Sequence, residues 1–201
     1  MGCDIHPCVE VKQEDGSWKA IPDPKPPEWV KKPNYEWDFG RSYTCFSVLA
    51  NVRNHYEMKP IAELRGLPED ATEETRKEVD DGLHSVSWLS LPEILSYDWD
   101  QVVRMEGWVG PEEFKRYMER GAPESYCRGV GGGNVAHVSN SDMRRIVQNG
   151  PYPWEKDKSF YTLLHWEEKY RDVCGNLFAM LDEVKKLGDP ERIRIVFGFD
   201  S

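Results

Sequence analysis

The sequence predicts an α+β fold in which a small, mainly antiparallel sheet is packed by helices. Two observations lead to this class. Residues 2–12 and 17–22 alternate between apolar and polar types around a tight turn, and residues 193–199 alternate in the same way near the other end of the chain. Several segments between these ends have helical spacing, and strands segregated from helices are typical of α+β domains. We therefore expect a single domain over residues 1–201, with an irregular insertion at 99–158.

The N-terminal hairpin is predicted by its turn and by the residues on its two faces. Asp15-Gly16 between two alternating runs is a strong hairpin signal. Period-two alternation places an apolar set on one face of the first strand: Cys3, Ile5, Pro7, Val9 and Val11. The opposite face carries a potential metal ligand or proton carrier at each position: Asp4, His6, Cys8 and Glu10. Because a solvent face usually shows inert polar residues, we interpret this face as one wall of a site.

The segments between the two ends contain the predicted helices. After a proline-rich loop at 22–33, an apolar stripe predicts a helix from Thr44 to about Val52, capped by Ser42 or Thr44. Further helices are predicted at 68–81, 92–97 and 111–120, the last ending at Gly121. The stretch 159–187 is predicted as the longest helix, with Gly175 inside it as a kink or close contact and Gly188 at its end. The final strand should pair with the N-terminal hairpin.

Composition limits the function classes. The formal net charge of −10 argues against a long nucleic acid as partner, because such binding depends on neutralising phosphates. No apolar run approaches the roughly 18 residues of a membrane span, and the start of the chain does not read as a secretory signal. The five cysteines show no paired zinc spacing, which indicates free thiols in a reducing cytoplasm.

Asp4-Ile-His6 is the sharpest candidate for chemistry. Two ligands two residues apart on a strand lie roughly 6–7 Å apart at the backbone, so their side chains can converge on one ion. Mixed carboxylate and imidazole ligands suit Zn²⁺, Mn²⁺ or Fe²⁺. We expect Asp4 and His6 as metal ligands, and the alternative is that both hydrogen-bond to neighbouring loops.

His84-Ser-Val-Ser-Trp88 is the second candidate. It is expected on an exposed loop that enters the helix at 92–97. His84 there would act as an acid or base, Ser85 and Ser87 would offer hydroxyl groups, and Trp88 would stack on a base or sugar ring. The alternative is a tryptophan in the core and a histidine that caps the helix.

Three arginines form the third signal. Arg41, Arg53 and Arg65 each lie in a predicted loop or at the end of an element, where recognition residues concentrate. A guanidinium fork suits phosphate or carboxylate groups. The alternative is that each arginine pairs with one of the 36 acidic side chains.

Several phrases occur together in this chain: Met1-Gly-Cys-Asp-Ile-His6, Arg41-Ser-Tyr43 leading to Leu49-Ala-Asn-Val-Arg-Asn54, Pro60 to Pro68, His84-Ser-x-Ser-Trp-Leu89, and Arg194-Ile-Val-Phe-Gly-Phe-Asp200. As a set they resemble an uncharacterised family of bacteriophage and prophage proteins that open with Met-Gly-Cys-Asp-Ile-His. The resemblance covers residues 1–11, 38–98 and 190–201. It implies a phage origin and the cytoplasm of an infected bacterium, and it supplies no mechanism. Small phage accessory proteins often counter host defence by cleaving or sequestering nucleotide signals, which is an analogy of context.

The leading hypothesis is a phage accessory protein that binds, and hydrolyses, a small phosphorylated, nucleotide-like ligand. Asp4 and His6 would bind a divalent metal, and protons would be moved by His6, Glu10 and His84. The ligand would contact the three arginines and the segment from Ser85 to Trp88.

Two alternatives belong to other classes. One is a non-catalytic sponge that sequesters a nucleotide immune signal as an anti-defence device. The other is a protein-binding inhibitor of a host factor, which would use an acidic surface and exposed aromatics such as Trp29, Trp37 and Trp154. Assembly into a homo-oligomer is left open.

Overall fold

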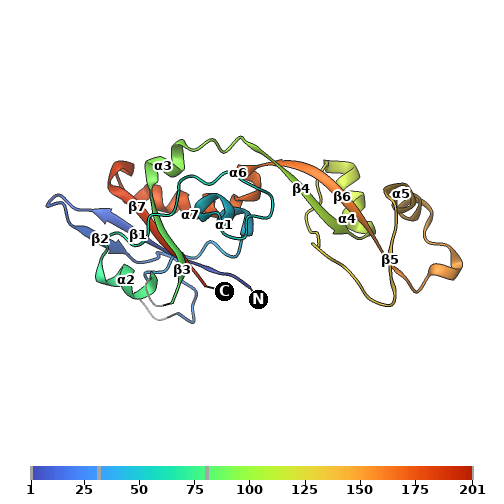
Figure 1. Cartoon of the computed structure of the whole chain (residues 1–201), viewed down its shortest axis with the longest axis horizontal. Helices are drawn as coiled ribbons and strands as arrows, with labels where there is room; N and C mark the ends of the chain where they lie inside the picture. The colour runs from blue at the N-terminus through green and yellow to red at the C-terminus, as the bar shows by residue number, and fades with distance from the viewer. Residues whose placement is uncertain (1, 31–32, 80–81, 201) are drawn as a thin grey trace. The chain divides into compact units, whose positions relative to one another are not determined.

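The computed structural model describes residues 2–30, 33–79 and 82–200, and the chain forms two compact units. Unit 1 comprises Met1–Gln101 and Tyr170–Ser201, and unit 2 comprises Val102–Lys169 (Figure 1). Helices and strands are both abundant in the described residues, which confirms the α+β class. The interpretation as a single domain with an insertion stays a prediction. Within the same residues, no helix is both long and apolar enough to cross a membrane.

Unit 1 is built on an antiparallel sheet with the strand order β2-β1-β7-β3. Its strands are β1 (Ile5–Lys12), β2 (Trp18–Ile21), β3 (His84–Ser90) and β7 (Ile193–Phe199). The predicted hairpin and its pairing with the last strand are confirmed, since Ile5 lies opposite Phe199 (Figure 1). Gly16 has a φ of 88° in the hairpin turn, a conformation that glycine adopts without strain. Because β1 pairs with β2 on one side and with β7 on the other, it is an inner strand of the sheet.

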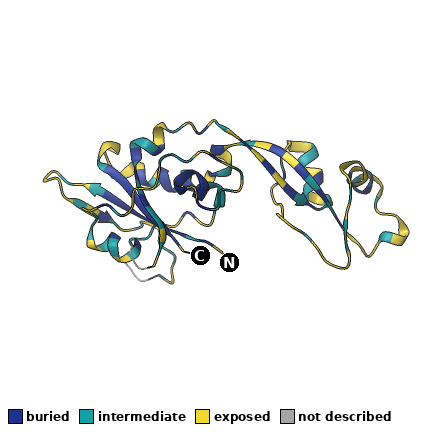
Figure 2. Ribbon diagram, in the orientation of Figure 1, coloured by how far each residue is buried: buried dark blue, intermediate teal, exposed yellow. Residues whose placement is uncertain are grey.

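Both faces of this sheet are covered, which the sequence pattern did not show. On one face Phe199 packs edge-on against Phe46 of helix α1 (Tyr43–Ala50), with ring centroids 5.2 Å apart. On the other face Cys8 and Val196 pack with Val79 of helix α2 (Glu73–Val79). Every residue of β7 is buried, as the dark strands of Figure 2 show. The face that carries His6 and Glu10 is thus partly an interior face.

The shorter predicted helices are close to the observed ones. Ser42 is the N-cap of α1, and Ser90 forms a capping box with Glu93 in α3 (Leu91–Ser96). Helix α4 (Pro111–Arg120) ends at Gly121, which has a φ of 84°. Helix α2 is shorter than the predicted 68–81, and residues 80–81 lie outside the described ones.

The predicted long helix at 159–187 is wrong. Ser159–Lys169 form strand β6, followed by helix α6 (Tyr170–Val173), helix α7 (Gly175–Val184) and a 3-10 turn at Lys185–Leu187. Phe160, Leu163 and Leu164 fit a helical stripe, but burial in this segment follows period two. The run is rich in aromatic residues, which favour strands. Gly175 begins α7 and does not interrupt a helix.

The stretch 99–158, predicted as an irregular insertion, contains regular strands and helices, most of them within unit 2. Strand β4 (Val102–Val109) pairs antiparallel with β6, and β5 (Val135–His137) pairs parallel with β6. Helices α4 and α5 (Asn140–Asn149) pack beside this three-stranded sheet. A 3-10 turn lies at Pro153–Glu155 of unit 2, and another lies at Pro190–Arg192 of unit 1. Burial alternates along β4, and the sequence shows the matching alternation of apolar with polar residues. The charged and exposed Arg104 and Glu106 are the reason why the segment was not predicted as a strand.

Candidate functional site

Five charged or titratable side chains meet where β1 begins and β7 ends. We call this group the His6 cluster: Asp4, His6, Glu36, Arg41 and Asp200. The backbone positions it from three segments of unit 1. Asp200 follows β7 and accepts from the backbone N–H of Asp4 at 2.7 Å, and the backbone N–H of Asp200 donates to the Asp4 carbonyl at 3.2 Å. Glu36 lies beside β1 through an isolated bridge to Cys8.

His6 is held between two carboxylates. Its Nδ1 lies 3.2 Å from Oε1 of Glu36, and its Nε2 lies 3.6 Å from Oδ2 of Asp200. The hydrogen bond with Glu36 is the main cause that raises the pKa of His6, Asp200 adds to it, and burial opposes it. Nε2 is buried and has no hydrogen-bond partner within the described residues. A buried polar nitrogen without a partner is unusual and calls for an explanation.

Arg41 and Asp4 form a bidentate pair at the solvent side of the cluster. Nε of Arg41 donates to Oδ1 of Asp4 at 2.6 Å, and Nη2 donates to Oδ2 at 2.5 Å. This contact holds the pKa of Asp4 below its usual value. Both side chains are about half exposed, and exposed ion pairs contribute no more than about 1 kcal/mol.

Asp4 and His6 lie in one cluster, as predicted, but they are not arranged as a pair of metal ligands. Both carboxylate oxygens of Asp4 accept from Arg41. Across the described ranges, no group of three or more His, Cys, Asp or Glu side chains is placed to hold a metal ion. The two atoms of the cluster that face each other and could both bind a metal ion are Nε2 of His6 and Oδ2 of Asp200. The metal stays a prediction.

The structure places Glu10 in the interior, in what we call the Arg194 network. Oε2 of Glu10 accepts from Arg194 at 2.7 Å, and Oε1 accepts from the backbone N–H of Thr72 at 2.8 Å. Glu10 is fully buried, and Arg194 also pairs with Asp70 at 2.7 Å. The Trp18 ring covers the guanidinium at 3.8 Å. These contacts fasten the segment before α2 to the sheet, so Glu10 does not face a ligand here.

Arg65 is also engaged within the protein. Its guanidinium donates to both carboxylate oxygens of Glu93, at 3.0 and 2.5 Å, and lies 4.7 Å above the Trp88 ring. The hydrogen bonds from Arg65 lower the pKa of Glu93 to about 2. Ser87 is buried and its Oγ accepts from the backbone N–H of Arg65 at 3.0 Å. Arg41 and Arg65 therefore each pair with an acidic side chain of the protein, which was the alternative to a role in ligand binding.

His84 lies on strand β3 and not on the predicted loop. It is opposite Phe199, and its ring stacks near that of Phe199 with centroids 6.1 Å apart. His6 is opposite Gly198, the neighbouring residue of β7. Because successive strand residues project to opposite faces, His6 and His84 leave the sheet on opposite sides. The structure therefore does not unite the two histidines in one site.

The remaining predicted residues, Ser85 and Arg53, both have a positive φ. Ser85 has a φ of 52°, and its Oγ lies 3.0 Å from Nδ1 of His84, within a bulge of β3. Arg53, in the turn after α1, has a φ of 52°. Among the tryptophans expected to be exposed, Trp29 and Trp154 are, but Trp37 is only 2% exposed. Its Nε1 donates to the Ile21 carbonyl at 2.8 Å, which anchors the proline-rich loop.

The sequence did not reveal a cavity of about 480 Å³ between the proline-rich loop and α7. Trp37, Phe39 and Met180 are among its apolar walls, and an ion pair of 2.6 Å between Lys25 and Glu183 lies at its rim. The segment 36–41 borders both this cavity and the His6 cluster, because Glu36 and Arg41 stand at its two ends. In the sequence, Trp37 and Phe39 alternate with the acidic Glu36 and Asp38, and this pattern could have indicated that the two aromatic side chains face the interior.

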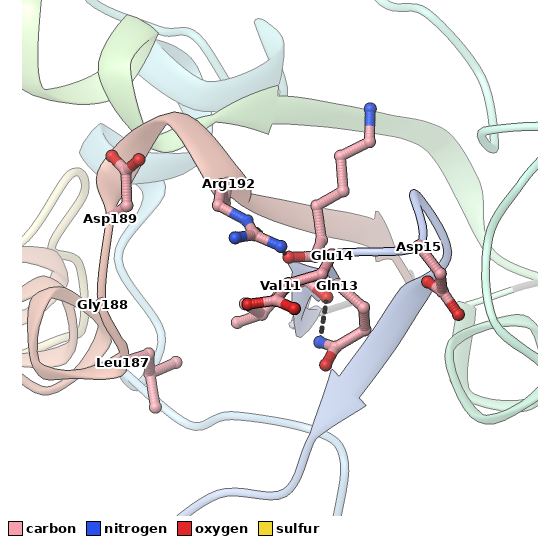
Figure 3. Close-up of a pocket in the computed structure, with 9 residues that line it drawn as sticks. Val11, Gln13, Glu14, Asp15, Leu187, Gly188, Asp189 and Arg192 are labelled. Atoms are coloured by element: carbon pink, nitrogen blue, oxygen red, sulfur yellow. Dashed lines mark hydrogen bonds between the residues drawn. The ribbon is translucent and has the colours of Figure 1, made fainter.

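A second cavity, of about 640 Å³, lies at the other end of β1 (Figure 3). Nε of Arg192 donates to the Lys12 carbonyl at 2.8 Å, and Gln13 donates to the Val11 carbonyl at 2.9 Å. The walls also include the acidic Glu14, Asp15 and Asp189, so their charges are mixed. None of the predicted site residues lines it.

Comparisons of the chain with protein-family models, curated proteins and solved structures found no match. The chemistry of the site therefore has to be argued from its own residues.

Proposed function

We propose that the protein binds a small phosphorylated, nucleotide-like ligand at the His6 cluster and hydrolyses a phosphoester bond in it. The observation that carries the proposal is His6 itself. Glu36 holds Nδ1, while Nε2 is buried without a hydrogen-bond partner among the described residues. A carboxylate that fixes one imidazole nitrogen orients the ring and stabilises its charged form, which suits proton transfer at the other nitrogen.

Arg41 supports the phosphate part of the proposal. Its guanidinium is half exposed and lies in the same cluster as His6. A phosphate oxygen pair matches the fork that Asp4 now occupies, and the exposed pair with Asp4 is weak enough to exchange. When Nε2 and Nδ1 of His6 both carry protons, the imidazolium adds a second positive charge.

The cavity beside the segment 36–41 supports the nucleotide-like part. Phe39 and Trp37 line it, and Arg41 follows Phe39 by two residues in the chain. A ligand with its phosphate at Arg41 would reach these walls with an aromatic ring.

A divalent metal at Nε2 of His6 is the alternative to proton transfer at that atom, because one nitrogen cannot bind a metal and carry a proton at once. Nε2 of His6 and Oδ2 of Asp200 would hold it, and its charge would offset the three carboxylates of the cluster. Glu36 on Nδ1 would then orient the ligand imidazole, as carboxylates commonly do for metal-binding histidines. Glu10 and His84 have no part in this version of the site.

The first experiment combines three measurements on purified protein. Heat denaturation followed by mass spectrometry identifies any bound small molecule, a metal assay is made on the same sample, and a panel of cyclic and linear nucleotides is followed for cleavage. We expect His6→Asn to lower turnover about 10²- to 10⁴-fold, the usual contribution of a general acid or base. Arg41→Gln should weaken ligand binding about tenfold, the cost of lost charged hydrogen bonds. His84→Asn is the matched control for His6→Asn, and Arg104→Gln is the matched control for Arg41→Gln. Both controls should leave turnover and ligand binding unchanged.

Each other outcome has a defined meaning. Intact ligand recovered at one per chain, with His6→Asn binding it as well as the parent, would replace catalysis with sequestration. No ligand, no metal and no cleavage across the panel would overturn the proposal.

A second candidate function has its own observation in unit 2. Trp154 is 76% exposed and stacks on Tyr152 with centroids 4.7 Å apart, and Arg145 lies 4.0 Å from the Tyr152 ring centroid. Trp, Tyr and Arg dominate the energetic centres of protein interfaces. This surface favours binding of a host protein, and Trp154→Ala should then abolish co-purification of that protein, while His6→Asn should not.

A further inference from the structure

Two buried thiols face each other in unit 1, away from the His6 cluster. Cys45 lies in the first turn of α1, and Cys174 comes directly before α7. The segments that carry them are tied together, since Oγ1 of Thr44 donates to the Val173 carbonyl at 2.7 Å. Thr44 and Val173 directly precede Cys45 and Cys174, so this bond brings the two cysteines together, and both are fully buried.

The surroundings make the two thiols unequal. Hydrogen bonds from the Cys174 thiol, the Ser42 hydroxyl and the Leu177 backbone lower the pKa of Cys45, against the effect of burial. Its position at a helix N-terminus acts in the same direction. The pKa of Cys174 is raised, because its proton bridges to Cys45 and burial disfavours a second charge. Because Cys45 lies in the first turn of α1 and Cys174 lies outside a helix, we assign Cys45 as the nucleophile and Cys174 as its partner thiol.

The other cysteines differ in a way that provides controls. Burial raises the pKa of the Cys8 thiol, which packs among apolar residues under α2. Cys3 is buried, and Cys127 is exposed and belongs to unit 2.

We propose that Cys45 and Cys174 form a redox-active dithiol that a peroxide converts into an intramolecular disulfide. The Cys45 thiolate attacks one oxygen of hydrogen peroxide, the O–O bond breaks, and the departing hydroxide takes a proton to become water. Cys45 is then a sulfenic acid. The Cys174 sulfur attacks the Cys45 sulfur, the S–O bond breaks, and a second water leaves with the thiol proton. Two thiols and one peroxide give one disulfide and two waters, and peroxide is the oxidant.

The site is independent of the proposed function. It takes a small peroxide, which is close to water in size and reaches buried thiols during local opening of the fold. The disulfide would link α1 to α7, and a cross-link between segments far apart in sequence restricts the unfolded chain.

The test uses the full chain. The reduced protein is treated with hydrogen peroxide at stoichiometric concentration, remaining thiols are blocked with an alkylating reagent, and peptides are mapped by mass spectrometry. We expect a peptide pair joined through Cys45 and Cys174, with a mass lower by two hydrogens, that a thiol reductant reverses. Cys8→Ser and Cys127→Ser should form the same disulfide.

Two variants separate the steps. Cys174→Ser should stop the reaction at a Cys45 sulfenic acid that dimedone traps, while Cys45→Ser should leave Cys174 as a thiol. Oxidation of Cys127 with Cys45 and Cys174 still alkylated would overturn the proposal, and so would a disulfide between another pair. The peptide map of the unsubstituted protein decides the question even if a variant fails to fold.

Discussion

His6 keeps its proton to a higher pH than a free imidazole because Glu36 and Asp200 flank it. A group whose pKa is raised on folding contributes stability that is fully present below its unfolded value, 6.5 for His6. That stability is lost as the pH rises through the folded pKa. We predict that the parent protein loses free energy of unfolding relative to His6→Asn as the pH rises from about 6 upward. Urea denaturation at a series of pH values measures it.

A control variant tests whether the Glu36 carboxylate is the cause of the raised pKa of His6. In Glu36→Gln, the pKa of His6 followed by NMR should return toward 6.5, since the main cause of the raised pKa is gone. Identical pH dependence of the parent protein and His6→Asn would show that the flanking carboxylates do not act on the imidazole.

The buried pair of Glu10 and Arg194 should be costly to break. Replacing Glu10 removes the buried carboxylate partner of Arg194 and leaves only the largely exposed Asp70, and breaking a buried pair typically costs about 3–5 kcal/mol. We predict a loss of this size for Glu10→Gln in urea denaturation. Glu167→Gln breaks a largely exposed pair with Arg104 and should cost less than about 1 kcal/mol.

A double variant tests the interpretation. Glu10→Leu with Arg194→Met removes both charges, so its cost should be well below the sum of the single costs. Equal costs for Glu10→Gln and Glu167→Gln would mean that Glu10 is not held as an interior ion.

At the scale of elements, β3 packs unusually closely on β7. A Cβ added to Gly198 would lie 2.9 Å from Cβ of Leu83 and 3.2 Å from Cγ2 of Val86. We predict that Gly198→Ala destabilises unit 1 by about 1–3 kcal/mol, the usual cost of overpacking. Hydrogen exchange along β3 should become faster.

Gly175→Ala is the matched control, because nothing lies within 4 Å of its added Cβ and the residue opens α7. It should leave the stability unchanged or raise it slightly. A Gly198→Ala protein as stable as Gly175→Ala would show that β3 can move off β7 freely.

The sequence predicted the elements whose local signals agree. The hairpin and the last strand combine alternation with turn signals, and both are confirmed. In residues 159–169, apolar residues fit the helical and the strand period alike, and pairing with β4 decides for the strand. Strand β3 escaped prediction because Ser85 has a positive φ and a bulge interrupts the alternation.

The candidate site was predictable only in part for a similar reason. Asp4 and His6 share a strand face, so their proximity follows from local geometry. Glu36 and Asp200 join them through strand pairing between distant segments, which no local pattern shows. Alternation placed Glu10 on the correct face, but it could not show that Arg194 and the segment before α2 cover it.

At the scale of the whole molecule, unit 2 is a continuous segment inserted into a discontinuous unit 1. The two points where the chain leaves and re-enters unit 1 are hydrogen-bonded, with Tyr170 N–H donating to the Gln101 carbonyl at 2.9 Å. A short linker can therefore replace residues 102–169. We predict that the shortened protein keeps the fold of unit 1 and unfolds cooperatively, as circular dichroism during heating would measure.

Removing residues 190–200 is the contrasting change. It deletes β7, which pairs with both β1 and β3, and should abolish the cooperative transition. A shortened protein without residues 102–169 that also lacks a transition would show that unit 1 depends on unit 2 for its stability.

The pairing of β1 with β7 has a consequence for synthesis on the ribosome. Ile5 cannot meet Phe199 until the segment that separates the two residues has been made. At about 5–20 residues per second, the edge of β1 that pairs with β7 therefore waits on the order of ten to forty seconds, while its other edge can pair with β2 at once. Unit 2 is complete in the nascent chain before that time. Unit 2 should therefore fold before unit 1, and β1 completes its pairing only after β7 has been made.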